Sequence, residues 1–433
     1  MRVSVVVCGY FKKYIQREIE AATGYSIYKP LQGWRTVKRK RWVYGEHMPW
    51  TDAAKQENNA RKGFVELVEP VPESEWKIFK GDRSYSTMAS GGTVREGVLL
   101  GIGNPLLDIS VYGDAELLAR YGLKENNAVL AAPEQHQLFH EIVENYNPTY
   151  IAGGATQNSI RVAQWLLQTP NATTFFGSVG NDRFGHILEK VAQKVGVNVK
   201  YQVCEGEETG RCAAIITGEN RSLITELGAA KKLCVDYVRR PENWAYVEKA
   251  QFFYEGGFLL SASPEVVLTI ARHSSAARKT LAMNLHATFL CKYFADPSLG
   301  LMEHVDVLFG NSDEAREYAN EAGFGTQDVK EIALKASLLH KANADRPRVI
   351  VITQGKQSTI VATEGKVEEI AVKPVDPSII VDTNGCGDAF VGGFLAQLVQ
   401  NRPLSECLRC GSYAAREVIQ HFGCQYPEHP EFV

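Results

Sequence analysis

The chain has 433 residues, of which 45% are hydrophobic and 22% charged, with a formal net charge of −3. Its longest apolar runs fall far short of the roughly 18 residues that a spanning helix needs, which excludes a membrane protein. The first 50 residues carry ten basic and three acidic side chains and the remainder 37 basic and 47 acidic ones, so the acidic body excludes duplex nucleic acid as its partner.

Residues 1–97 lack a regular pattern of strands and helices, and we expect a basic N-terminal extension that is largely irregular or disordered. Its run Val37–Arg41 is typical of a solvated surface or of a nuclear-import signal. The nine cysteines show no repeated spacing, which favours free thiols in a reducing compartment. We therefore expect a cytoplasmic protein, with a nuclear fraction as the alternative. Cys407 and Cys410 form a CxxC pair that reads as a helix start rather than a zinc site.

From residue 98 onward, apolar strand patterns alternate with amphipathic helical ones. The expected strands are 98–103, 173–176, 250–254, 279–285, 305–309 and 348–353. The expected helices are 155–168, 183–195, 264–273, 312–322 and 329–341. This alternation predicts an α/β fold, in which a mostly parallel sheet is covered by helices on both faces.

Shorter alternating strands interrupt this rhythm in the first half of the chain. They fall at 107–111, 128–131, 200–204, 212–216 and 222–225. Turn residues such as Gly218-Glu-Asn220 separate them, so we expect a small discontinuous β-sheet, built from excursions near 107–131, 145–153 and 200–227, that acts as a lid.

The segment Asp382-Thr-Asn-Gly-Cys-Gly-Asp388 carries the clearest chemical signal, because it stands directly before an apolar helical run. Small residues at a loop-to-helix junction can expose backbone N–H groups to an anion at the positive end of the helix. A carboxylate beside such an anion site would repel phosphate, so Asp388 makes sense as a base that takes a proton from an attacking hydroxyl. The alternative is an acidic residue in an ordinary first helical turn.

Two further segments fit the same chemistry. One strand runs into Asn104-Pro-Leu-Leu-Asp108, and a later one leads into Gly153-Gly-Ala-Thr-Gln-Asn158 at a helix start. The glycines let a ligand approach the backbone, and Asp108 with Asn158 can hold vicinal hydroxyls by hydrogen bonds. Taken singly, each is equally compatible with a turn or a helix end.

These collinear motifs, together with Gly218-Glu-Asn-Arg221, Asn311-Ser-Asp-Glu314 and Thr353-Gln-Gly355, resemble the ribokinase (PfkB) superfamily of carbohydrate kinases and, within it, the adenosine kinase family. The resemblance runs from about residue 98 to the C-terminus. It implies a ribokinase-like three-layer α/β/α sandwich at 98–433. It also implies ATP-dependent phosphorylation of the adenosine 5′-hydroxyl in purine salvage, with ATP as co-substrate, Mg²⁺ as cofactor and a monomeric state.

The resemblance also implies a role for each matched residue. Asp388 is the general base, Arg221 on the lid approaches the phosphates, and the backbone of Gly385, Cys386 and Gly387 forms the anion hole. Substrate-binding positions are Asn104, Leu106, Asp108, Gly153, Gly154, Asn158, Phe258 and Phe289, with apolar walls from Leu130, Cys212, Leu223 and Leu227. ATP-binding positions are Thr353, Gly355, Asn311 and Asn384. Asn311 and Glu314 influence Mg²⁺ through water, and helix capping is the alternative for that pair.

Three positions depart from the family pattern. Cys386 stands where the family has Ala, which suggests that thiol reagents inhibit the protein. Ala155 replaces a hydroxyl residue and Ala128 replaces a Gln that contacts substrate. Two other functions stay open: another sugar or nucleoside kinase of the superfamily, and a catalytically silent nucleoside-binding protein.

Overall fold

The computed structural model describes residues 94–124, 128–217 and 220–432, which all belong to the unit of residues 71–433. The expected extension up to residue 93, including the basic run at 37–41, lies outside the described residues. The side chains of Ala128, Asn220 and Arg221 do so too.

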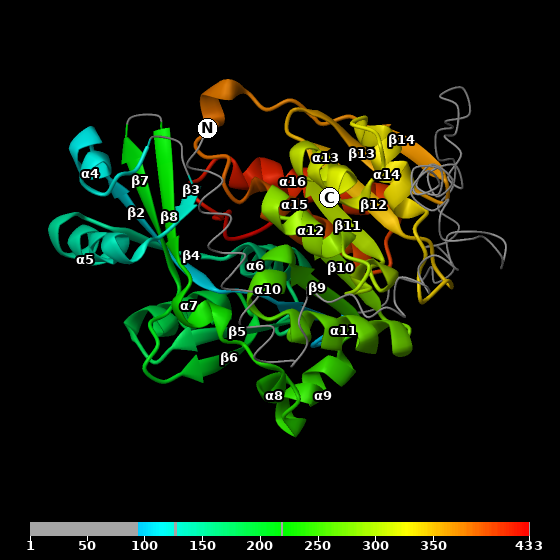
Figure 1. Ribbon diagram of the computed structural model, residues 1–433, viewed down its shortest axis with the longest axis horizontal. Coiled ribbons are helices and arrows are strands. Elements are labelled where there is room, and N and C mark those ends of the chain that lie inside the picture. The colour runs from blue at the N-terminus through cyan, green and yellow to red at the C-terminus, as the bar shows by residue number, and fades with distance from the viewer. Residues whose placement is uncertain (1–93, 125–127, 218–219, 433) are drawn as a thin grey trace, which may run out of the picture. The chain divides into compact units, whose positions relative to one another are not determined.

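A nine-stranded sheet lies at the centre of this unit (Figure 1). Its order is β14-β13-β12-β11-β10-β9-β1-β5-β6, and the pairs from β12 to β6 are all parallel. The strands are β1 (Leu99–Ile102), β5 (Thr173–Gly180), β6 (Asn198–Cys204), β9 (Phe252–Gly256), β10 (Thr280–Asn284), β11 (Val307–Asn311), β12 (Val349–Gln354), β13 (Gln357–Thr363) and β14 (Lys366–Ile370). Six of them confirm the six strands expected from the apolar runs, because buried parallel strands are apolar on both faces.

Helices cover both faces of this sheet, which confirms the three-layer α/β/α arrangement. One face packs against α8 (Val235–Val238), α9 (Pro241–Lys249), α10 (Gly257–Ala262), α11 (Pro264–Ala276), α12 (Cys291–Ala295), α13 (Ser312–Ala322) and α14 (Val329–Ser337). The other face packs against α6 (Ala155–Leu167), α7 (Arg183–Lys194), α15 (Cys386–Leu398) and α16 (Leu404–Val418). Successive residues of β9 point to opposite faces of the sheet: Phe253 belongs to the apolar core under α8 to α14, and Tyr254 to the core under α6, α7, α15 and α16.

A second, five-stranded sheet lies beside the large one, at the left of Figure 1, in the order β3-β8-β7-β2-β4. Its strands are β2 (Leu106–Tyr112), β3 (Ala128–Leu130), β4 (Thr149–Gly153), β7 (Arg211–Thr217) and β8 (Asn220–Glu226). Helices α4 (Ala115–Arg120) and α5 (His136–Asn145) share its apolar core with Leu107, Ile109 and Val111. Strand alternation therefore puts Asp108 on the opposite face, free of these helices.

One expected strand was assigned to the wrong sheet. The segment 200–204 lies in β6, which pairs with β5 at the edge of the large sheet and takes no part in the small one. An edge strand is covered incompletely, and β6 has one buried residue, one exposed residue and five partly buried ones. Such a mixed pattern fits a strand of a small two-faced sheet equally well, so the pattern alone could not separate the two.

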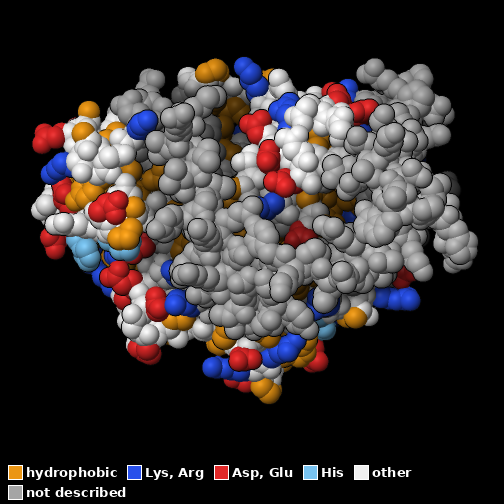
Figure 2. Space-filling model, viewed as in Figure 1, with side chains coloured by type: hydrophobic (Ala, Val, Ile, Leu, Met, Phe, Trp, Pro, Cys, Tyr) orange, Lys and Arg blue, Asp and Glu red, His pale blue; other side chains and the backbone are white. Residues whose placement is uncertain are grey.

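No described helix has both the length and the apolar character that crossing a bilayer requires. On the face shown in Figure 2, acidic and basic side chains of the described residues are interspersed rather than gathered by sign. Cys407 and Cys410 lie within α16 and are both buried, in keeping with the helical pattern expected around this CxxC pair.

Candidate active site

Asp388 lies in the first turn of α15, and the residues before it shape that turn. Gly385 is the N-cap and has a φ of 78°, in the left-handed region. A Cβ at this position would also lie 3.0 Å from the Cβ of Cys424, so both backbone and space call for glycine. The loop is held by Asp382, whose two carboxylate oxygens accept from the amides of Asn384 at 2.9 Å and Gly423 at 2.8 Å.

Asn158 contacts Asp388 from a much earlier part of the chain. Its Nδ2 donates to Oδ2 of Asp388 at 3.0 Å, across 230 positions of sequence. Asn158 lies in the first turn of α6, and Gly154 caps this helix with a φ of 88°. A Cβ on Gly154 would lie 2.4 Å from the carbonyl oxygen of Asn104, so this strand-to-helix turn also requires glycine.

The carboxyl group of Asp388 holds its proton more tightly than an ordinary aspartate. Burial is the largest cause and raises its pKa to about 7, while the hydrogen bond from Asn158 lowers it and the charges of Asp108 and Glu314 raise it. The side chain stays partly accessible to solvent. A carboxylate with a pKa near neutrality is a good proton acceptor at physiological pH.

Asp108 approaches this pair from the small sheet. Its strand β2 pairs with β4, and a Cβ on Gly153 at the end of β4 would lie 2.5 to 2.6 Å from the carboxyl atoms of Asp108. The missing side chain therefore leaves the space that the Asp108 carboxylate occupies. The neighbouring strand β7 places Cys212 level with Asp108, and β8 places Thr225 level with Cys212, so these side chains share the face without helices.

The N-terminus of α15 offers backbone donors beside Asp388. The amides of Gly387 and Asp388 have no acceptor among the described residues, whereas that of Cys386 makes a long bond of 3.4 Å to the carbonyl of Thr383. The amide of Gly385 likewise has no backbone acceptor among the described residues, so two of the three residues expected to form an anion hole, Gly385 and Gly387, keep their amides available. The helix adds partial positive charge at this end.

The remaining expected substrate positions gather around the same end of the sheet. Asn104 is buried and donates to the carbonyl of Ala230 at 2.6 Å, while its Oδ1 has no partner among the described residues. Phe258 and Phe289 are 38% and 57% exposed, with ring centroids 6.3 Å apart. Two aromatic rings this exposed, side by side, provide an apolar surface that a flat ring system can cover.

Asn311 and Glu314 form a reciprocal capping box at the start of α13. Asn311 Oδ1 accepts from the amide of Glu314, while both carboxylate oxygens of Glu314 accept from Asn311, at 2.7 and 2.9 Å. Helix capping, the alternative to a role near Mg²⁺, therefore accounts for the contacts between these two residues. No cluster of three or more metal-type ligands occurs within the described ranges.

The other expected residues fall at separate places. Thr353 is the second-last residue of β12, and its Oγ1 lies 3.5 Å from the carbonyl of Gly310; Gly355 follows the strand in a turn with a φ of 60°. Arg221 lies in β8 opposite Ile216, and its side chain is outside the described residues. Burial raises the pKa of the Cys386 thiol to about 12, which leaves almost no thiolate at neutral pH.

Sequence reasoning missed three polar residues close to this site. Tyr254 and His286 lie 3.3 Å apart, from the hydroxyl to Nε2, and the His286 ring stacks on Phe258 with 5.2 Å between centroids. Arg161 is 6% exposed and lies one turn beyond Asn158 on α6. Tyr254 and His286 stand at the ends of apolar strand patterns and Arg161 within a helical pattern, where residue type and spacing assign them no particular role.

The comparisons with known proteins agree with this geometry. The chain matches the pfkB family of carbohydrate kinases over residues 115–431. It is 48% identical over 337 residues to adenosine kinase 2 of Arabidopsis thaliana, covering 78% of this chain and 98% of that one, and 41% identical to the adenosine kinase of Schizosaccharomyces pombe, covering 76% and 96%. The chain therefore belongs to the pfkB family of carbohydrate kinases and, within that family, to the adenosine kinases.

Solved structures give the same result. The structure of Anopheles gambiae adenosine kinase in complex with P1,P4-di(adenosine-5) tetraphosphate is 44% identical with a TM-score of 0.73, covering 78% of this chain and all of that one. Adenosine kinase from Schistosoma mansoni in complex with adenosine and AMP is 31% identical with a TM-score of 0.70, covering 77% and 98%. The expected ribokinase-like fold is thus confirmed.

Proposed function

We propose that this protein transfers the γ-phosphoryl group of ATP to the 5′-hydroxyl of adenosine and releases AMP and ADP. The observation that carries this proposal is the convergence of Asp388, Asn158 and Asp108 at one end of the large sheet, in a chain that covers almost the full length of adenosine kinases. A base, a hydroxyl-binding pair and free helix amides are what phosphoryl transfer to a sugar hydroxyl requires.

Asp388 acts as the general base. Its carboxylate takes the proton of the 5′-hydroxyl as the oxygen attacks phosphorus, and the pKa of about 7 makes both protonation states accessible near neutral pH. Asn158 holds the carboxylate by the 3.0 Å hydrogen bond to Oδ2, so that Oδ1 is left for the substrate.

The N-terminus of α15 stabilises charge on the transferring phosphoryl group. The Gly387 amide has no acceptor among the described residues, and that of Gly385 precedes it in a turn set by a left-handed φ. Hydrogen bonds from donors that are already in place become stronger as negative charge develops on the phosphoryl group, and the donors need not reorganise during the reaction. Cys386 contributes its backbone, and the 3.4 Å bond to Thr383 is weak enough to yield to an anion.

Adenosine occupies the space between the two sheets. Asp108 and Asn158 bind the ribose hydroxyls beside the glycine turn of Gly153 and Gly154, and the exposed rings of Phe258 and Phe289 cover the purine. Asn104 follows the end of β1 and Leu106 is the first residue of β2, so both lie at the junction between the two sheets. The small sheet, from which Asp108 and Arg221 come, acts as the lid, and its closure excludes water that would compete with the nucleoside.

ATP lies over α15 and the ends of β11 and β12, near Asn311, Thr353, Gly355 and Asn384. Mg²⁺ neutralises phosphate charge when bound. Both oxygens of Glu314 already accept hydrogen bonds from Asn311, so these two residues fit contact with the ion through water and do not fit direct ligation. We further propose a monomer in a reducing compartment, in keeping with the free cysteines of the described residues, with a nuclear fraction as the alternative.

The test compares adenosine, inosine, ribose and fructose as acceptors, with ATP and Mg²⁺ under identical conditions. Adenosine is expected to give the highest kcat/KM by at least about tenfold, because ribose and fructose cannot use the aromatic surface. A sugar that is phosphorylated faster would replace this function with that of another kinase of the family. Absence of transfer to any of the four would indicate a nucleoside-binding protein.

A further inference from the structure

Arg161 is a buried cation that faces Asn158. It lies three residues further along α6, on the same side of the helix, and 6% of its surface is exposed. Its Nη1 donates to the carbonyl oxygen of Ala152 at 2.9 Å and lies 3.5 Å from Oδ1 of Asn158. The Ala152 bond fixes where the guanidinium sits, and the longer contact aims its charge at the amide oxygen of Asn158.

The amide of Asn158 therefore lies between two opposite charges. Its oxygen faces the Arg161 guanidinium and its nitrogen faces the Asp388 carboxylate. A flipped amide would turn the NH₂ group toward the cation and the carbonyl toward the carboxylate, which is unfavourable on both sides. The charge of Arg161 thus selects the one orientation in which Asn158 can donate to Asp388.

Residues 423–426, near the C-terminus, contact Arg161 and the loop before α15. The ring of Tyr426 lies 5.7 Å from the guanidinium carbon and stacks on Trp165 of α6 with 4.8 Å between centroids. The same segment is tied to the loop before α15 through Gly423, whose amide donates to Asp382. One short stretch of chain therefore contacts both the helix that carries Asn158 and the loop that leads to Asp388.

We propose that Arg161 is a positioning residue, which orients the amide of Asn158 toward Asp388 and is itself held by Tyr426. This inference rests on the proposed function, because it assigns Arg161 a part in preparing the general base. Arg161 acts through Asn158, whose amide oxygen its guanidinium contacts, and Arg161 itself needs no contact with the substrate.

Other groups also bear on the charge of Asp388 and stay in place when Arg161 is changed. They are Asp108 on β2, Glu314 on α13, Tyr254 on β9, and the thiols of Cys386 and Cys424. A shift in the titration of Asp388 on substitution of Arg161 therefore reports on the amide between them.

The experiment measures the titration of Asp388 in the full chain with Arg161→Met, which keeps the apolar stem and removes the charge. The probe is the side-chain carboxyl carbon of Asp388 by NMR, assigned by its absence in Asp388→Asn, alongside the pH profile of kcat/KM for adenosine. We expect the acidic limb and the carboxyl titration to move up by about one pH unit together, with near wild-type turnover recovered at high pH. Arg161→Lys, which keeps the charge, should shift them by less than half as much.

Two further variants separate positioning from a structural role. Arg409→Met removes an arginine of α16 that lies 4.1 Å from the ring of Phe432, on the same C-terminal segment as Tyr426, and that pairs with Glu406; this change should leave the titration unchanged. In an Asn158→Ala background, Arg161→Met should add no further shift. An added shift of the same size would show a direct charge effect on Asp388 and overturn the proposal, as would an unshifted titration in folded Arg161→Met.

If Arg161→Met does not fold, Tyr426→Leu gives the second test, because it loosens the guanidinium and keeps its charge. A smaller upward shift of the same titration supports the proposal, and the absence of any shift overturns it. The carboxyl titration needs no turnover. A wild-type protein that makes no AMP would thus defeat the proposed function while the titration still decides on Arg161.

Discussion

Asn158 and Asp388 are joined by a hydrogen bond of 3.0 Å although 230 positions separate them in the chain. The bond links the first turns of α6 and α15, two helices on the same face of the large sheet. Because Asn158 donates, it favours the charged form of Asp388 and partly offsets the effect of burial on this carboxyl group. The pair is therefore the point at which the fold sets the basicity of the site.

The rate of adenosine phosphorylation should rise with pH through about 7, since Asp388 must lose its proton before it can accept one. Asn158→Ala removes the interaction that lowers this pKa, so the acidic limb of kcat/KM should move to higher pH, by about one unit. KM for adenosine should rise as well, because in the proposed function Asn158 binds the ribose. An acidic limb that stays in place would show that Asp388 is not the titrating group.

Asp388→Asn should stabilise the protein at alkaline pH. The pKa of Asp388 is raised on folding, so the native state loses stability as pH rises from the unfolded value near 4 to the folded value near 7, and the loss is complete above it. The partly accessible side chain tempers this cost, and we expect Tm to rise by about 2–4 °C at pH 8 and hardly at pH 4. Calorimetry at both pH values checks this, and an equal change at both would contradict it.

Gly153→Ala should weaken adenosine binding, because its methyl group would meet the carboxyl atoms of Asp108 at 2.5 to 2.6 Å. The displaced Asp108 would lose its place at the ribose, and KM for adenosine should rise by about tenfold or more, at little cost to kcat. The double variant Gly153→Ala, Asp108→Ala should bind no worse than Asp108→Ala alone. Additive losses would mean that the methyl group acts elsewhere.

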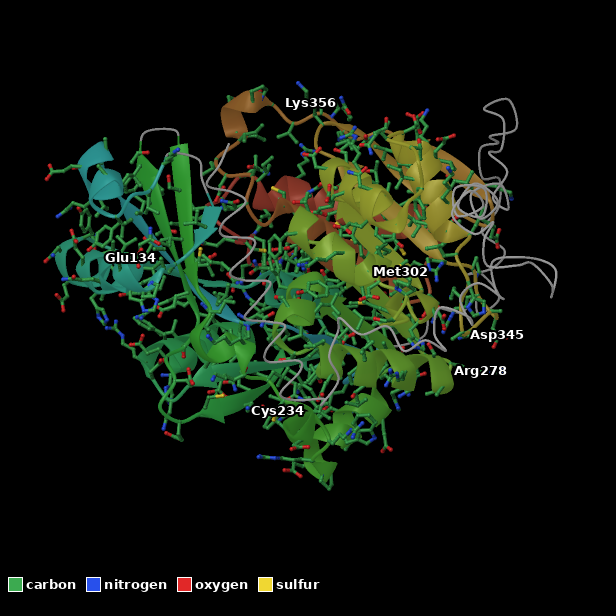
Figure 3. All side chains as sticks on the ribbon, viewed as in Figure 1. Glu134, Cys234, Arg278, Met302, Asp345 and Lys356 are labelled. Atoms are coloured by element: carbon green, nitrogen blue, oxygen red, sulfur yellow. The ribbon has the colours of Figure 1, made fainter. Side chains whose placement is uncertain are left out.

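Thiol reagents should inactivate the protein slowly at pH 7.5, contrary to what Cys386 suggests in the sequence. Burial raises the pKa of this thiol to about 12, whereas Cys234, labelled in Figure 3, is exposed. Mass spectrometry after iodoacetamide should find Cys234 modified first, with activity retained. Rapid loss of activity in the wild type and not in Cys386→Ala would restore the original hypothesis.

Much of the fold was predictable because its signals are local. Six strands of the large sheet, β1, β5, β9, β10, β11 and β12, are short apolar runs. The bounds expected for 312–322 agree with α13, which has a capping box at its start and glycine at its end. The hairpin of β13 and β14 was not expected, and β6 was placed in the wrong sheet. β6 and β14 are the two edge strands of the large sheet, and the pattern of an edge strand fits more than one partner.

The site was predictable wherever chemistry requires a particular residue type at a turn. Gly154, Gly385 and Asp388 are such residues, since positive φ angles and a helix N-terminus leave a visible pattern. Arg161 left none, because the role that we propose for it depends on a contact with Tyr426, far along the chain. Asn311 and Glu314 left an ambiguous one, because the same spacing serves to cap a helix and to approach a metal through water.

The most direct test of the account is the turnover of Asp388→Asn with adenosine, ATP and Mg²⁺. The variant keeps the shape of the side chain and an oxygen that can accept from Asn158, but it cannot take a proton from the 5′-hydroxyl. We predict that kcat falls by about 10³-fold or more while the Kd for adenosine, measured by calorimetry, changes less than about threefold. AMP formation within tenfold of the wild-type rate would contradict the assignment of Asp388 as the base.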